Sequence, residues 1–191
     1  MNHHHPSTRH IPDERSVSWL ALVGFMGTGK SRIGWELSRR LSLTFIDTDK
    51  VIERVSCMRI GEIFETYGEA TFRDYETEII RRCLKLEDVV ISTGGGTAVR
   101  PENRQLLKSR GPVVALWASP QTIYARTRRH KRPLLEVGNP LERIEELLEA
   151  RRSAYEDVAT INILSDGRDS SEVVEEIVEK LWLWTHQHES V

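Results

Sequence analysis

The sequence has few cysteines, no long apolar run and no excess of either charge, and each absence excludes a class of protein. Its two cysteines, Cys57 and Cys83, form no Cys-x-x-Cys pair, so we expect neither a disulfide framework nor a zinc knuckle. No apolar run approaches the roughly 20 residues that cross a bilayer. These features are typical of a cytoplasmic protein that does not enter a membrane.

The charges are nearly balanced. There are 27 Lys and Arg residues against 29 Asp and Glu, a formal net charge of -2 at pH 7. This balance gives no reason to expect nucleic acid or an anionic membrane as a partner, so any anion-binding site has to be local. Because 39% of the 191 residues are hydrophobic, the chain can bury the core of one domain, which we expect to be monomeric.

The two ends are expected to lie outside this domain. Residues 1–15 contain His3, His4 and His5 but no apolar segment of a signal peptide, so we interpret them as a disordered tail or tag remnant rather than a metal-binding tract. The domain is expected over 16–185, followed by a short tail at 186–191.

Short β-branched runs alternate with longer amphipathic stretches, a pattern that predicts an α/β fold in which helices cover a parallel sheet. The predicted strands are 17–23, 44–47, 89–93, 113–117 and 160–164. Two insertions interrupt the alternation and favour mobile substrate-handling elements: a mostly helical segment at about 48–86 and a basic segment at about 126–140, interpreted as a lid.

The stretch GFMGTGKS, residues 24–31, matches the phosphate-binding pattern G-x-x-x-x-G-K-[ST] between a buried strand and an amphipathic helix. In this pattern backbone N–H groups bind phosphate oxygens, Lys30 reaches the β and γ phosphates, and the Ser31 hydroxyl binds Mg²⁺. The residues expected to bind nucleotide here are Gly27, Thr28, Gly29, Lys30, Ser31 and Arg32.

The end of the third strand, where P-loop ATPases have a carboxylate for Mg²⁺, has none here, so the carboxylate has to come from another element. No Asn-Lys-x-Asp occurs, which disfavours a GTPase, and the third strand, VVIST, ends without the Asp of P-loop ATPases. The second strand ends in FIDTD, so Asp47 and Asp49 are expected to project to one side at the sheet edge where ligands bind. Either they cap a helix, or one approaches Mg²⁺ and the other an acceptor hydroxyl; we favour the second.

A glycine triplet and two arginines are candidates for binding the molecule that accepts the phosphoryl group. Gly94, Gly95 and Gly96 follow the third strand; a tight turn would explain them, but we favour a substrate wall with close backbone approach and unusual φ values. Arg73 and Arg151 come from separate helical segments. Each could pair with a neighbouring Glu, or both could converge to bind a planar carboxylate.

A basic cluster precedes PLL in the predicted lid. A solvated surface or a nucleic-acid patch would account for it, but in a P-loop enzyme a mobile basic segment can close over the polyphosphate. The cluster contains Arg126, Arg128, Arg129, Lys131 and Arg132.

The order and spacing of six motifs resemble those of the shikimate kinase family. From about residue 19 to the last helix, the motifs are GFMGTGKS, FIDTD, IGEIFETYGEATFRDYE, STGGGTAV, RPLL and RRSAYEDVA. The resemblance implies a nucleoside monophosphate kinase-like, three-layer αβα fold with strand order 2-3-1-4-5, a shikimate-binding subdomain and a lid. It also implies Mg²⁺-dependent transfer of the ATP γ-phosphoryl group to the 3-hydroxyl of shikimate, a step of chorismate and aromatic amino-acid biosynthesis.

The resemblance further implies roles for individual residues. Asp49 holds the acceptor hydroxyl and is the candidate base, Asp47 lies near Mg²⁺, and Arg132 is the lid arginine that reaches ATP. The expected binders of shikimate are Arg73, Gly94, Gly95, Gly96 and Arg151, and Arg168 belongs to the adenine loop. Two alternatives remain: another small-molecule kinase of similar architecture, such as a gluconate kinase, and a nucleotide-responsive binding or regulatory module that keeps the fold without catalysis.

Overall fold

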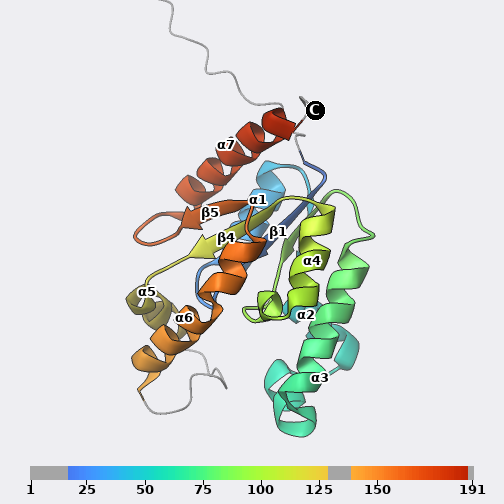
Figure 1. Cartoon of the computed structure of the whole chain (residues 1–191), viewed down its shortest axis with the longest axis vertical. Helices are drawn as coiled ribbons and strands as arrows, with labels where there is room; N and C mark the ends of the chain where they lie inside the picture. The colour runs from blue at the N-terminus through green and yellow to red at the C-terminus, as the bar shows by residue number, and fades with distance from the viewer. Residues whose placement is uncertain (1–16, 129–138, 189–191) are drawn as a thin grey trace, which may run out of the picture.

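Five parallel strands form the central sheet, in the order β2-β3-β1-β4-β5 (Figure 1). The computed structural model describes residues 17–128 and 139–188. The strands are β1 (Trp19–Val23), β2 (Thr44–Asp47), β3 (Val89–Ser92), β4 (Val113–Trp117) and β5 (Ile161–Leu164). The predicted fold class and strand order are therefore confirmed, and three of the strands are one or two residues shorter than expected.

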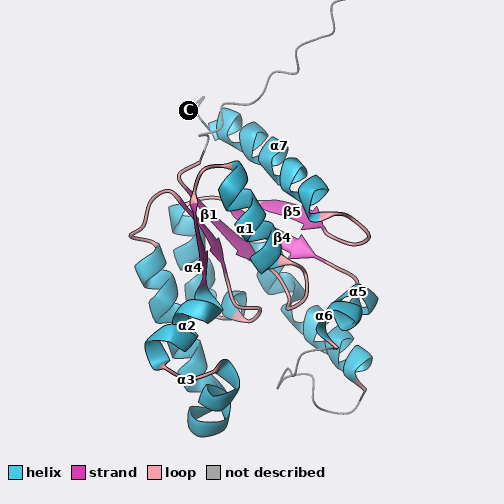
Figure 2. Ribbon diagram, turned by 180° about the vertical axis from the view of Figure 1, so that it is seen from behind, coloured by secondary structure: helices cyan, strands magenta, loops and turns pink. Residues whose placement is uncertain are grey.

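Helices cover both faces of the sheet, as Figures 1 and 2 show from opposite sides. They are α1 (Lys30–Arg40), α2 (Thr48–Ser56), α3 (Ile60–Cys83), α4 (Pro101–Arg110), α5 (Pro120–Thr127), α6 (Pro140–Val158) and α7 (Ser170–His188), with a short 3-10 helix, η1 (Thr97–Val99). Helices α1 and α7 share one apolar cluster with the sheet, and α3, α4 and α6 share the other.

The first strand lies in the middle of the sheet and is buried on both faces. All five of its residues are buried, with Leu20 and Leu22 in the α1–α7 cluster and Trp19, Ala21 and Val23 in the opposite one. A strand covered on both faces reads as a continuous apolar run rather than an alternating one, which explains the sequence WLALV.

The carboxyl ends of β1, β2 and β3 meet at one edge of the sheet. Asp47 is in register with Ser92 on β3, and Leu22 on β1 is in register with the same residue. Thr93 donates from both its backbone N–H and its hydroxyl to the carbonyl of Leu22, at 3.0 and 2.9 Å. The parallel sheet thus places the phosphate-loop motif, the FIDTD motif and the glycine triplet side by side.

Helix α3 bends at Gly68, whose φ of 81° and ψ of 170° interrupt the helix. No heavy atom lies within 4 Å of a Cβ built there, so the positive φ rather than lack of space is what favours glycine. The helical segment expected at 48–86 is present as α2 and α3, and its assignment as a substrate subdomain stays a prediction.

The predicted lid and the two predicted tails lie partly or wholly beyond the residues that the structure describes. Most of the predicted lid, including Arg132, lies outside the described residues, as do 1–16 and 189–191. Helix α7 continues to His188, three residues into the tail expected from 186. Both cysteines are free thiols, and none of the helices in the described segments is long and apolar enough to span a membrane.

Candidate active site

The phosphate-loop motif joins β1 to α1 through three glycines with positive φ. These are Gly24, Gly27 and Gly29, at 135°, 80° and 100°. A Cβ on Gly24 would lie 2.3 Å from the carbonyl oxygen of Leu116, so glycine lets the loop pass close to β4. Gly29 is the N-cap of α1 and supplies no side chain to the first turn, whose N–H groups therefore face the loop, as anion binding requires.

Lys30 is buried within this loop. Its Nζ donates to the carbonyls of Gly24 and Phe25, at 2.7 and 2.8 Å. The backbone of the motif holds the ammonium group next to the N-terminus of α1, so two sources of positive potential coincide there.

Ser31 and Asp47 come from different elements and are joined directly. The Ser31 hydroxyl donates to Oδ2 of Asp47 at 2.6 Å, while Oδ1 of Asp47 accepts from the backbone N–H of Lys50 at 3.3 Å. Asp47 therefore caps α2 and also reaches the phosphate loop, so the two interpretations of this residue do not exclude each other.

Asp49 lies in the first turn of α2 rather than on the end of β2. The expectation that Asp47 and Asp49 project from one strand is therefore wrong in detail, because Asp47 ends the strand by capping the helix. Thr48 accepts a hydrogen bond from the backbone N–H of Gly94 at 3.1 Å, which ties the start of α2 to the glycine triplet. Asp49 reaches the site from the helix instead.

The glycine triplet makes room for protein side chains. None of Gly94, Gly95 and Gly96 has a positive φ, so the expected unusual backbone conformation is absent. A Cβ on Gly94 would lie 2.7 Å from Oδ1 of Asp49, and one on Gly96 would lie 2.2 Å from Nη1 of Arg73. A larger residue at either position would have to displace the carboxylate or the guanidinium from its place in the site.

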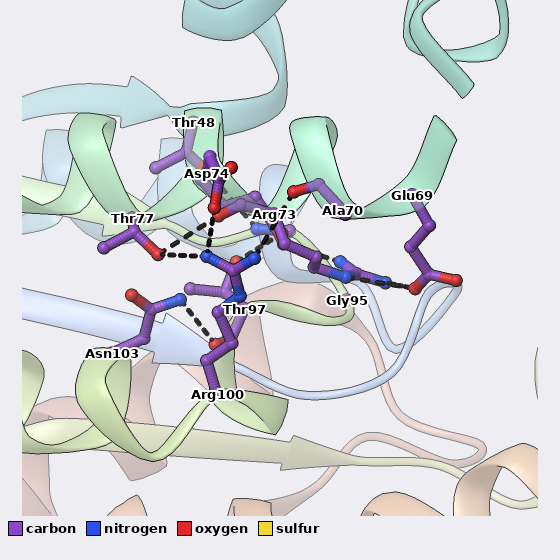
Figure 3. Close-up of polar contacts among 12 residues, drawn as sticks. Thr48, Glu69, Ala70, Arg73, Asp74, Thr77, Gly95, Thr97, Arg100 and Asn103 are labelled. Carbon is purple, nitrogen blue, oxygen red and sulfur yellow. Dashed lines mark hydrogen bonds and ion pairs between the residues drawn. The ribbon is translucent and has the colours of Figure 1, made fainter. Parts of the chain in front are cut away.

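Arg73 is held by two carboxylates on its own helix, Glu76 and Glu69, of which Figure 3 shows Glu69. Its Nη1 donates to Oε2 of Glu76 at 2.6 Å, and the two side chains are only 9% and 1% exposed. The other Glu76 oxygen accepts from the hydroxyl of Thr97 at 2.6 Å. Burial alone would lower the pKa of Arg73, but the charges of Glu76 and Glu69 and their hydrogen bonds raise it above its ordinary value.

Arg151 reaches the glycine triplet from α6. Its Nη1 donates to the carbonyl of Gly95 at 3.2 Å, and its guanidinium lies 5.4 Å from the ring centre of Phe25. The hydroxyl of Tyr155, one turn further along α6, donates to the same carbonyl at 2.5 Å. Burial raises the pKa of Tyr155 to about 12 despite the nearby Arg151 charge, so its hydroxyl remains a donor.

Several of these residues line a cavity of about 590 Å³, within the range of roughly 300–1,000 Å³ typical of small-molecule sites, whereas Lys30 and Tyr155 are not part of its wall. Ser31 and Asp47 lie on its wall together with Asp49 and Glu76, and the two arginines converge on it. The remaining wall includes Met26, Lys50, Glu53, Arg59, Glu65, Phe72 and the three glycines. The cavity thus joins the Ser31–Asp47 pair of the phosphate-loop edge to a side that carries Arg73 and Arg151.

Of the predicted nucleotide contacts in the described residues, only Ser31 lines this cavity; Gly27, Thr28, Gly29 and Lys30 of the phosphate loop do not, and neither do Arg32 and Arg168. Arg32 is 72% exposed on its side chain and pairs with Glu36. Arg168 pairs with Glu176 and donates to two backbone carbonyls. Arg132 lies outside the described residues.

Glu76 and Tyr155 were not predicted as site residues, and Arg126 was not predicted to link two loops of the site. Glu76 lies three residues after Arg73, and Tyr155 lies four after Arg151; this spacing on one helix face was the available signal. Arg126 of α5 donates to the carbonyls of Gly27 and Ser165, at 3.2 and 3.1 Å, and so links the phosphate loop to the loop after β5.

The fold and site define a P-loop kinase that acts on a small molecule, and comparison with known proteins gives its family. The family model described as shikimate kinase matches residues 26–182, so the chain belongs to the shikimate kinase family. The expected class of enzyme, an ATP-dependent small-molecule kinase, is confirmed by this membership.

Individual relatives agree along nearly the whole chain. A shikimate kinase of Deinococcus radiodurans is 56% identical over 171 residues, 90% of this chain and 87% of the relative. One of Thermus thermophilus is 54% identical over 170 residues, 88% of this chain and 92% of the relative. The structure of a shikimate kinase from Acinetobacter baumannii in complex with shikimate superposes with a TM-score of 0.84 at 36% identity, over 86% of this chain and 93% of that one.

Proposed function

We propose that this chain transfers the γ-phosphoryl group of ATP to the 3-hydroxyl of shikimate, giving shikimate 3-phosphate and ADP for aromatic amino-acid biosynthesis. The observation that carries the proposal is a cavity whose wall contains both the Ser31–Asp47 pair and the two arginines, Arg73 and Arg151. A carboxylic acid accounts for two arginines and a neutral polyol does not; between the carboxylic acids shikimate and gluconate, membership of the shikimate kinase family favours shikimate.

The donor half of the proposed site is the phosphate loop. Residues 27–32 bind the phosphates through backbone N–H groups, and Lys30 places a positive charge at the β and γ phosphates. Ser31 and Asp47 offer only oxygen ligands, which suits Mg²⁺, and the described residues hold no group of three His, Cys, Asp or Glu side chains that would form a complete metal site by themselves. Mg²⁺ bound there neutralises charge on the phosphates.

The acceptor half is the glycine triplet with its surrounding charges. Arg73 and Arg151 bind the shikimate carboxylate, and the glycines form the wall on which the ring lies. Asp49 accepts the hydrogen bond of the reacting hydroxyl. As the oxygen forms its bond to the γ-phosphorus, the bond to the β–γ bridging oxygen breaks and the hydroxyl proton passes to Asp49. Catalysis then comes chiefly from position and charge.

We further propose roles for the predicted lid, the adenine loop and the acceptor subdomain. Residues 126–140 act as a lid whose Arg132 reaches the ATP phosphates, Arg168 contributes to the adenine loop, and 48–86 form the acceptor subdomain. We propose a cytoplasmic monomer that needs neither nucleic acid nor a membrane.

Steady-state phosphorylation of shikimate tests the function. The full chain with ATP and Mg²⁺ should release ADP in proportion to shikimate 3-phosphate. Absence of turnover at millimolar shikimate would refute the proposal, and faster turnover of gluconate would favour a sugar-acid kinase.

A further inference from the structure

Glu69 occupies one edge of the Arg73 guanidinium. Its Oε1 accepts from Arg73 Nε at 3.1 Å and from Nη2 at 2.6 Å, as Figure 3 shows. Arginine presents this edge, two parallel N–H groups, to a bidentate carboxylate. Because Glu76 holds Nη1 at the same time, three of the five guanidinium N–H donors bind carboxylates of the chain itself.

The two carboxylates on Arg73 differ in how firmly they are held. The Glu76 side chain is 1% exposed and also accepts from Thr97, so moving it would leave buried polar groups unpaired. The Glu69 side chain is 52% exposed and directly follows the bend of α3 at Gly68. A carboxylate that can turn into solvent is readily exchanged for another one.

We propose that Glu69 occupies the guanidinium edge of Arg73 that the acceptor carboxylate takes, so that acceptor binding has to displace Glu69. Glu69 thereby weakens the apparent affinity for the acceptor and acts as an affinity-determining residue that does not touch the reacting atoms. This inference rests on the proposed function, in which Arg73 binds the shikimate carboxylate.

The size of the effect follows from the partial exposure of the pair, in which the Glu69 side chain is 52% exposed and the Arg73 side chain 9%. Because one partner lies half in solvent, we expect the pair to contribute little, and a binding-competent state populated only in part reduces affinity by that fraction. Releasing Arg73 from Glu69 should therefore strengthen acceptor binding by about two- to sixfold.

The test is the Glu69→Gln variant of the full chain. We expect its KM for shikimate, and its Kd measured by calorimetry, to fall about two- to sixfold, with kcat and the KM for ATP within about a factor of two of the wild type. The carboxamide of shikimate, which has no carboxylate to compete with Glu69, should bind both proteins equally. Unchanged or weaker shikimate binding by Glu69→Gln, or an equal gain for the carboxamide, would overturn the proposal.

Two further variants separate competition from other effects. Glu78→Gln removes an ion pair of the same spacing on the same helix, Glu78 with Arg82 Nε at 2.9 Å, and should leave shikimate affinity unchanged. Glu65→Gln removes a carboxylate of the cavity wall and reports the effect of charge alone, which should be smaller. An equal gain in either variant would reject displacement. Turnover by the wild type tests the function separately, because the affinity ratio between variants is measured by calorimetry without turnover.

Discussion

Replacing Glu76 by Gln should weaken both the fold and acceptor binding, because Glu76 is the buried counter-charge of Arg73. The two side chains are 1% and 9% exposed and 2.6 Å apart. Removing one partner of a buried pair costs about 3–5 kcal/mol, and Gln, which keeps a hydrogen-bond acceptor, should fall at the lower end, near 3 kcal/mol. For a domain of this size about 1 kcal/mol corresponds to about 2–4 °C, so the melting temperature should fall by about 6–12 °C.

The same variant should raise the KM for shikimate and leave the KM for ATP nearly unchanged, because Arg73 loses its fixed orientation while the phosphate loop is untouched. The assays are differential scanning calorimetry and steady-state kinetics, with Glu78→Gln as the control that removes an exposed pair on the same helix. A Glu76→Gln protein that melts with the wild type and keeps its shikimate KM would refute the reasoning that the buried pair positions Arg73.

Three further substitutions test the remaining contacts. Tyr155→Phe removes the hydroxyl bond to the Gly95 carbonyl and should lower the melting temperature by about 2–4 °C while raising the shikimate KM, as scanning calorimetry and kinetics would reveal. Gly96→Ala puts a methyl group 2.2 Å from Arg73 Nη1 and should raise the shikimate KM about tenfold or more; an unchanged KM would contradict the packing. Asp49→Asn should lower kcat by about 10²-fold or more with nucleotide binding retained in titrations, whereas equal loss of both would indicate a structural role.

Much of the fold was predictable because its signals are local. The continuous apolar run of β1 indicates a strand buried on both faces, and the glycine pattern that follows indicates a phosphate loop. The structural role of Asp47 was harder to predict, because this residue both ends a strand and caps the next helix. The sequence does not show where the strand stops and the helix begins. This is why Asp49 was placed on the strand rather than on α2.

The convergence of the site depends on tertiary packing. The sequence indicated that Arg73 and Arg151 were candidates, but their meeting at the glycine triplet follows from the packing of α3 and α6 in the same apolar cluster on one face of the sheet. The glycines were explained by backbone conformation, whereas the structure shows that side chains of Asp49 and Arg73 fill the space. The i, i+3 spacing of Glu76 after Arg73 indicated a possible pair, but only the structure shows that the pair is buried.

The most direct test of the account is the comparison of shikimate with its carboxamide as acceptors for the wild-type chain and for Arg73→Ala. The account predicts that the wild type phosphorylates shikimate with a kcat/KM at least about tenfold higher than the carboxamide, as expected for a charge-assisted pair, and that Arg73→Ala removes most of this preference. Equal kcat/KM values for the two acceptors in the wild type, or an undiminished preference in Arg73→Ala, would contradict the central claim that buried arginines select a carboxylic acid.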